Sequence, residues 1–76
     1  MTYREGLIHE LAELGREYAT ADDDPLREEL HAARIEQRLA VLCDVVGSGD
    51  AMTAFFHGYR SYWLDRLAGT QAIDTG

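Results

Sequence analysis

The sequence predicts an all-α fold: an antiparallel three-helix bundle in the order short, long, short, completed by oligomerisation. Apolar residues recur at spacings of three and four along most of the chain, which is typical of amphipathic helices. Capping residues and glycines divide this pattern into three segments. The chain has 76 residues, enough for one small domain. Such a domain buries only about 60% of its unfolded surface, and association is a common way to gain stability.

The first helix is expected over about residues 3–19. Thr2 and Glu5 form a T-x-x-E capping box, which predicts a helix start at Tyr3. Apolar or aromatic residues then repeat at helical spacing, namely Tyr3, Leu7, Leu11, Leu14 and Tyr18. Gly15, within this stretch, indicates either a close crossing with another helix or early fraying of this one. The short acidic connector that follows, residues 20–23, suits an antiparallel hairpin.

The second helix, about residues 25–46, is expected to be the longest. Asp24 can cap it, Pro25 fits its first position, and Gly47 can end it. Its apolar residues form two seams on nearly opposite sides. The first seam, which we expect to face the chain's own core, comprises Leu26, Leu30, Ala33, Ala40 and Val41. The second seam, which we expect to face a second copy or another protein, comprises Ala32, Ile35, Leu39, Leu42 and Val46.

The third helix is expected over about residues 51–68. Ser48 or Asp50 can cap its start, and Gly69 can close its end. Gly58, in the middle, indicates either a close approach by another backbone or a glycine that the helix simply tolerates. Residues 1–69 are therefore expected to form a single helical domain, and residues 70–76 a flexible C-terminal tail.

One side of the third helix is rich in large apolar and aromatic side chains. They are Met52, Phe55, Phe56, Tyr59, Tyr62, Trp63 and Leu67. Phe56, Tyr59 and Trp63 are expected in the bundle core. Phe55 and Tyr62 lie at the edge of the arc, and aromatic residues are enriched at interfaces. We therefore expect these two to contact a subunit or a partner.

Composition and charge argue against several classes of partner. The net charge is −7, with seven arginines scattered among fourteen acidic residues and no lysine. Nucleic-acid binding needs a basic face, so we expect no nucleic-acid partner. No apolar run is long enough to span a membrane, and no signal-peptide pattern occurs. The single cysteine, Cys43, excludes an internal disulfide, so a cytoplasmic protein is expected.

A Glu-x-x-His pair, Glu28 and His31, is the most suggestive candidate for chemistry. Residues three apart share a helix face, and ferritin-like di-iron bundles use this motif to bind iron or manganese. Glu10 is a candidate third ligand, with the site formed at a subunit interface. Glutamates near a helix start are also expected for dipole reasons alone. The chain carries one such motif on three helices, so we expect no cofactor and keep the metal site as an alternative.

A second alternative is an accessory subunit that binds a small apolar anion. Arg66 lies within the aromatic arc, where it and Trp63 are candidate ligand-binding residues. Catalysis is not expected, because His57 and Cys43 lack a recognisable base or nucleophile partner.

These observations favour a small acidic helical protein–protein interaction module, acting as a homo-oligomer. Its role would be that of a regulator, adaptor or inhibitor. The expected partners are a second copy of the chain and another protein. The excess of apolar surface on the second and third helices is the main reason for this expectation.

Overall fold

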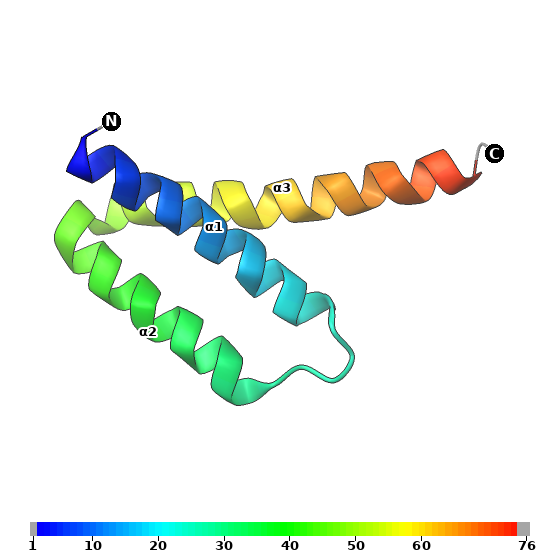
Figure 1. Cartoon of the computed structure of the whole chain (residues 1–76), viewed down its shortest axis with the longest axis horizontal. Helices are drawn as coiled ribbons and strands as arrows, with labels where there is room; N and C mark the ends of the chain where they lie inside the picture. Colours follow the sequence, from blue (N-terminus) through cyan, green and yellow to red (C-terminus); the bar gives the residue numbers. More distant parts are fainter. Residues whose placement is uncertain (1, 75–76) are drawn as a thin grey trace.

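The computed structural model describes residues 2–74 of the chain, and the side chains of residues 2–69. It contains α1 (Tyr3–Asp23), α2 (Glu29–Val46) and α3 (Ser48–Asp74), with no strand among the described residues (Figure 1). The prediction of an all-α chain with three helices is confirmed. None of these helices is both long and apolar enough to cross a membrane, within the part of the chain that the structure describes.

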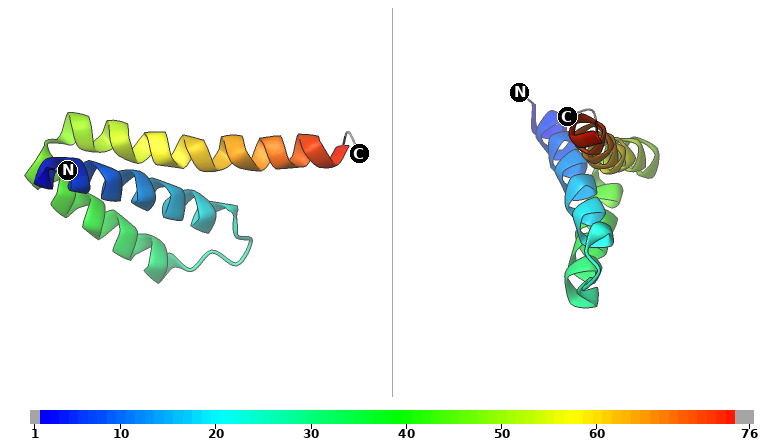
Figure 2. Two further views of the ribbon diagram at one scale, coloured as in Figure 1. Left: turned by 45° about the horizontal axis from the view of Figure 1, so that its top comes forward. Right: turned by 90° about the vertical axis from the view of Figure 1, so that its right-hand side faces the viewer.

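Consecutive helices run in opposite directions. α1 and α2 form a hairpin, and the chain then turns back at Gly47 so that α3 crosses α1 (Figure 1). The last turns of α3 extend beyond the other two helices (Figure 2). The molecule measures 45 × 30 × 18 Å along its principal axes.

The core lies where the three helices meet, at the end of the molecule that contains Gly47. It consists of Leu7, Leu11, Leu14, Ile35, Leu42, Val46, Ala51, Ala54 and Phe55. Removal of these side chains from water supplies the main driving force for the fold.

Two glycines hold α1 and α3 close together. A Cβ atom built on Gly15 would lie 1.9 Å from the carbonyl oxygen of Phe55, and one on Gly58 would lie 1.8 Å from that of Ala12. No side chain fits at either position without separating the helices. Of the two interpretations of each glycine, the close approach of another helix is therefore confirmed.

The helix ends follow the sequence signals at Thr2 and Gly47. The hydroxyl of Thr2 accepts a hydrogen bond from the N–H of Glu5 (3.2 Å), so α1 begins at Tyr3 as expected. Gly47 has φ of 106°, in the left-handed region, and its N–H donates to the carbonyl of Cys43 (2.9 Å). A single residue therefore links α2 to α3.

The predicted boundary between the first two helices is wrong. α1 continues to Asp23 instead of fading near Ala19, and α2 begins at Glu29 instead of Pro25. The Asp-Pro pair forms a turn: the Asp24 carboxylate accepts from the N–H of Leu26 (2.9 Å), and the Asp24 carbonyl accepts from the N–H of Arg27 (3.2 Å). Aspartate followed by proline favours a turn as well as a helix start, and here the turn prevails.

α3 also differs from its predicted bounds. It starts at Ser48, includes Gly69 and reaches Asp74. Glycine permits a helix to end without requiring it, and a Cβ on Gly69 would meet nothing within 4 Å. Residues 75 and 76 of the predicted flexible tail lie outside the described residues, as do the side chains of residues 70–74, so its mobility stays a prediction.

The two seams of α2 have the opposite burial to that predicted: the second seam faces the chain's own core and the first faces solvent. In the second seam Ala32, Ile35, Leu42 and Val46 are buried in the chain and Leu39 is half-buried. In the first seam Leu26, Leu30, Ala40 and Val41 are exposed and Ala33 is half-buried. Periodicity locates two opposite apolar faces but does not say which one meets α1. The larger side chains of the second seam fill the space beside α1, so the expectation that they face a partner is wrong.

The two neighbouring phenylalanines of α3 also have the opposite environments to those predicted. Phe55, expected at an interface, is 5% exposed and belongs to the core, whereas Phe56, expected in the core, is 57% exposed. Gly58 fixes the rotation of α3 because that side of the helix must face Ala12. Phe55 then points between the helices, and Phe56, turned by a further 100°, points outward.

Candidate functional site

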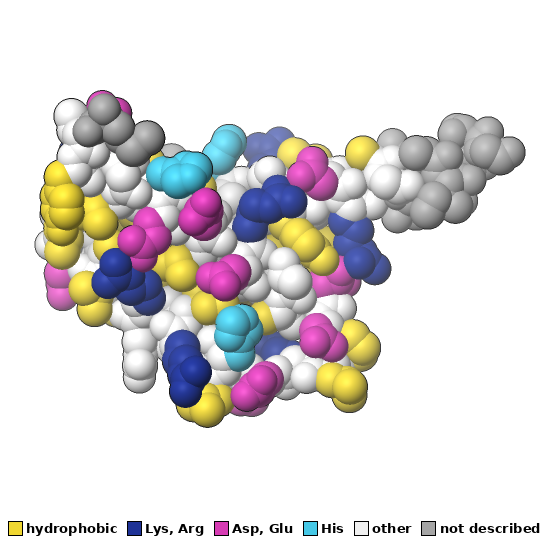
Figure 3. Space-filling view, viewed as in Figure 1, with side chains coloured by type: hydrophobic (Ala, Val, Ile, Leu, Met, Phe, Trp, Pro, Cys, Tyr) yellow, Lys and Arg dark blue, Asp and Glu magenta, His cyan; other side chains and the backbone are white. Residues whose placement is uncertain are grey.

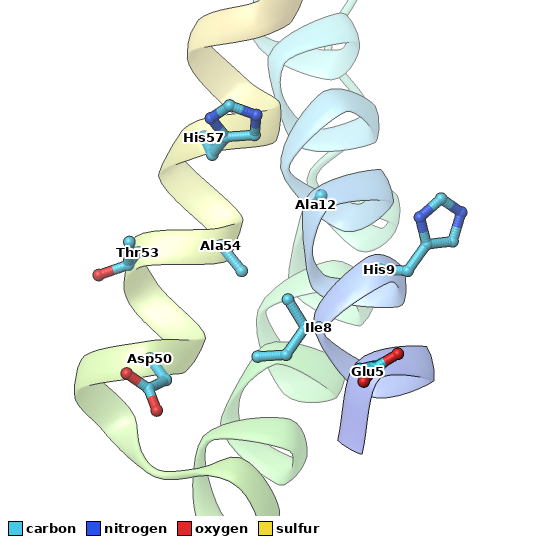
Figure 4. A pocket seen from close by; sticks show the side chains of 8 residues that line it. All are labelled: Glu5, Ile8, His9, Ala12, Asp50, Thr53, Ala54 and His57. Atoms are coloured by element: carbon cyan, nitrogen blue, oxygen red, sulfur yellow. The ribbon is translucent and has the colours of Figure 1, made fainter. Parts of the chain in front are cut away.

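An open groove runs between α1 and α3, on the side of this helix pair that faces away from α2 (Figure 4). Its volume is about 660 Å³. Ile8 and Ala12 from α1 and Ala54 from α3 form an apolar floor. The hollow exists because the alanine side chains are too short to fill it. The helices themselves lie close together at the nearby glycines.

The end of the groove near the starts of α1 and α3 is acidic. Glu5 and Asp50 lie on its two rims (Figure 4). Asp50 forms an ion pair with Arg4, which also donates to the carbonyl of Val46 (3.2 Å). His9, on the α1 rim, lies 3.2 Å from Glu13, one turn along the helix.

The groove continues past His57 into a smaller hollow of about 240 Å³ along α3. Arg60, Ser61 and Asp65 line it. Arg16 of α1 reaches across, and one of its nitrogens lies 3.0 Å from both the Ser61 hydroxyl and the Asp65 carboxylate. This end therefore carries two arginines, and we refer to the two hollows together as the α1–α3 groove.

The first seam contributes to an exposed surface of α2 that we call the outer face. It comprises Leu30, Ala33, Arg34, Gln37, Val41, Asp44 and Val45. Leu30 is 59% exposed, Val41 51% and Val45 55%. No residue three or four positions from Arg34 is acidic, and none at that distance from Asp44 is basic, so neither has an ion-pair partner on its own helix.

A polar and aromatic cluster surrounds the last turn of α1. The hydroxyl of Tyr59 donates to Asp22 (2.9 Å), that of Tyr62 donates to Asp23 (2.6 Å), and Arg66 forms an ion pair with Asp23. The hydrogen bond to the Asp23 carboxylate raises the pKa of Tyr62, whereas burial and then the bond to Asp22 raise the pKa of Tyr59. Cations and hydroxyls near these acids offset their unfavourable position at the negative end of a helix.

The predicted anion-binding residues belong to this cluster. Trp63 packs edge-to-face against the ring of Tyr62, with centroids 5.3 Å apart. Arg66 bonds to an acidic residue of the same chain, and neither Arg66 nor Trp63 lines the α1–α3 groove. Tyr62 is half-buried and bonds within the chain, so its contact with a partner stays a prediction.

The predicted metal ligands are not brought together. Glu10 accepts two hydrogen bonds from Arg38, at 2.6 and 3.1 Å, and these bonds lower the pKa of its carboxyl group. Glu28 precedes α2 and His31 lies exposed in the first turn of that helix. Across the described residues, no three His, Cys, Asp or Glu side chains gather closely enough to hold a metal ion.

Sequence reasoning did not predict the groove. Its floor consists of small residues such as Ala12 and Ala54, which carry no functional signature of their own. The only signal in the sequence was indirect: Gly15 and Gly58 each allowed a close helix approach as one of two interpretations, and a close crossing leaves grooves at its sides. Elsewhere, acidic, basic and apolar side chains are interspersed over the face shown in Figure 3.

The sequence and fold were compared with known proteins. No protein-family model matches the chain, and neither the curated proteins nor the solved structures include a significant match.

Proposed function

We propose that this chain is a small acidic helical module that acts by binding protein surfaces, as a homo-oligomer and as a regulator, adaptor or inhibitor. The outer face of α2 is the observation that carries the proposal. Single exposed apolar side chains are common on soluble proteins, but here three large ones share one helix face. Aligned apolar residues of this kind are typical of helices that pack against another helix.

The outer face alone would support only weak association. Full burial of a leucine or valine side chain contributes about 1.5–3 kcal/mol, and Leu30, Val41 and Val45 each have about half of their surface left to bury. Together they would contribute roughly 3 kcal/mol, which is less than the entropic cost of bringing two chains together. A stable complex therefore needs a complementary surface that supplies further apolar contact and ion pairs.

Sedimentation velocity over a range of concentrations tests the proposal. We expect the wild-type chain to form oligomers at micromolar concentration and Val41→Asp to remain monomeric, because the introduced carboxylate would be buried without a partner. Tyr3→Asp is the matched control, since it places the same charge at another exposed apolar position, in the first turn of α1. A wild-type chain that stays monomeric at all concentrations, or an equal loss of association in both variants, would contradict the proposal.

A further inference from the structure

The α1–α3 groove and the outer face of α2 carry charges of opposite sign at matching spacing. Along α3, the acidic end at Asp50 and the basic end at Arg60 are ten residues apart, which is about 15 Å on a helix. Along α2, Arg34 and Asp44 are also ten residues apart. A helix laid in the groove with Arg34 at the acidic end would therefore bring Asp44 to the basic end.

Three of these four charges, and Glu5 at the acidic end, have no partner among the described residues of one chain, whereas Asp50 pairs with Arg4. Among the described residues, the side chains of Arg34, Asp44, Glu5 and Arg60 take part in no ion pair or hydrogen bond. The other five arginines each form at least one ion pair with an acidic side chain of the same chain. The unpaired arginines thus lie on the two surfaces that also expose apolar side chains.

The two surfaces match in shape and polarity as well. The groove floor of Ile8, Ala12 and Ala54 is apolar and has room above its alanines. The outer face offers Val41 as a larger side chain between its two charges, and Leu30 lies one turn before Arg34. Small residues facing large ones allow two helices to interdigitate.

We propose that the α1–α3 groove is the docking site for the outer face of α2 from a second copy of this chain. The second copy's Arg34 lies at the acidic end, beside Glu5 and Asp50, and its Asp44 lies near Arg60. This inference rests on the proposed function, because it names the partner of the same outer face.

Such a contact joins the copies head to tail. α2 lies behind the α1–α3 pair when the groove faces the viewer, so the groove and the outer face are on opposite sides of the bundle (Figure 4). Each copy then docks into one neighbour and receives another. A contact of this kind builds a ring where the rotation closes and an open chain where it does not.

Two complementary variants test the docking site. Val41→Asp disables the outer face and leaves the groove intact; Thr53→Arg places a bulky cation on the exposed rim of the groove and leaves the outer face intact. We expect each variant to be monomeric alone by sedimentation velocity, and an equimolar mixture to form a dimer and nothing larger. Circular dichroism and thermal melts must show that both variants retain the wild-type helix content and a cooperative transition.

The results distinguish failure of the groove as docking site from failure of the proposed function. Association of Thr53→Arg alone at the wild-type level would overturn the groove as the docking site and leave the proposed function standing. Two monomeric variants that do not bind each other would also overturn it. A monomeric wild-type chain would contradict both proposals.

A charge exchange at the basic end provides an independent test that leaves the groove rim unobstructed. Asp44→Arg alone and Arg60→Glu alone should each raise the dissociation constant by about tenfold, because like charges then meet across the contact. The double variant, carrying both changes in every chain, should recover most of the loss. If the double variant lost as much affinity as the two single variants added together, the proposed placement of Asp44 beside Arg60 would be overturned.

Discussion

Replacing Gly58 by alanine should destabilise the bundle, although alanine is the better helix former. A Cβ at this position would lie 1.8 Å from the carbonyl oxygen of Ala12, and real Cβ atoms essentially never come closer than 3.0 Å, so the helices must move apart by about 1.2 Å. A gap of about 0.5–1 Å already forfeits roughly a quarter to a half of a dispersion contact, so this separation forfeits more. Overpacking against a backbone lowers the free energy of unfolding by about 3 kcal/mol, and the higher helix propensity of alanine offsets about 1 kcal/mol of this loss. We therefore expect a net loss of about 2 kcal/mol.

Gly6→Ala is the matched control, because a Cβ on Gly6 would meet nothing within 4 Å and only the propensity gain should remain. Urea unfolding followed by circular dichroism, at one fixed protein concentration, measures both changes. A loss of about 2 kcal/mol is large against the roughly 4–11 kcal/mol typical of a domain this size. A Gly58→Ala chain as stable as the wild type would refute the backbone contact between α1 and α3.

Three further perturbations test separate parts of the fold. Phe55→Ala should cost about 3–5 kcal/mol of unfolding free energy and Phe56→Ala less than about 1, since only the first creates a cavity; similar losses in urea titrations would contradict the observed rotation of α3. Arg38 lowers the pKa of Glu10, so this pair stabilises the folded chain at pH values above the ordinary carboxyl pKa. That stabilisation is lost as the pH falls through the lowered value. In Arg38→Gln, the free energy of unfolding should therefore fall less steeply between neutral and acid pH. The raised pKa of Tyr62 stabilises the folded chain below the ordinary tyrosine pKa, and this stabilisation is lost as the pH rises through the raised value. Ultraviolet titration should therefore show a higher midpoint of tyrosine ionisation in the folded chain than in urea. Tyr62→Phe should reduce this difference between the two midpoints.

The sequence was most informative where a residue has a single structural use. Thr2 followed by Glu5 caps a helix, and Gly47 takes a left-handed conformation, so two helix ends were predictable. Gly15 and Gly58 allowed a close helix approach as one of two interpretations, and in the structure both lie at the crossing of α1 and α3. Asp24 is different, because the carboxylate before a proline can cap a helix or close a turn, and only the surrounding chain decides between the two.

Rotation about a helix axis was the least predictable property. Both seams of α2 are apolar, and periodicity is unchanged when the helix turns by half a revolution. The choice depends on how side chains fill the space beside α1, which is a property of three helices together. For α3 the rotation is set by Gly58, but sequence alone does not reveal which backbone the glycine meets.

The reversed seams also explain why the chain has apolar surface left for association. α1 and α3 together cover one side of α2, and among the described residues no further helix covers the other side. The second seam is the buried one because its side chains are larger and pack against α1 along the hairpin. Leu30 and Val41 then remain exposed to water, and the free energy of burying them is not gained in the packing of α1, α2 and α3. Within the described part of the chain no helix covers the α1–α3 groove either, so an open groove lies on one side of the bundle and an exposed apolar helix face on the other.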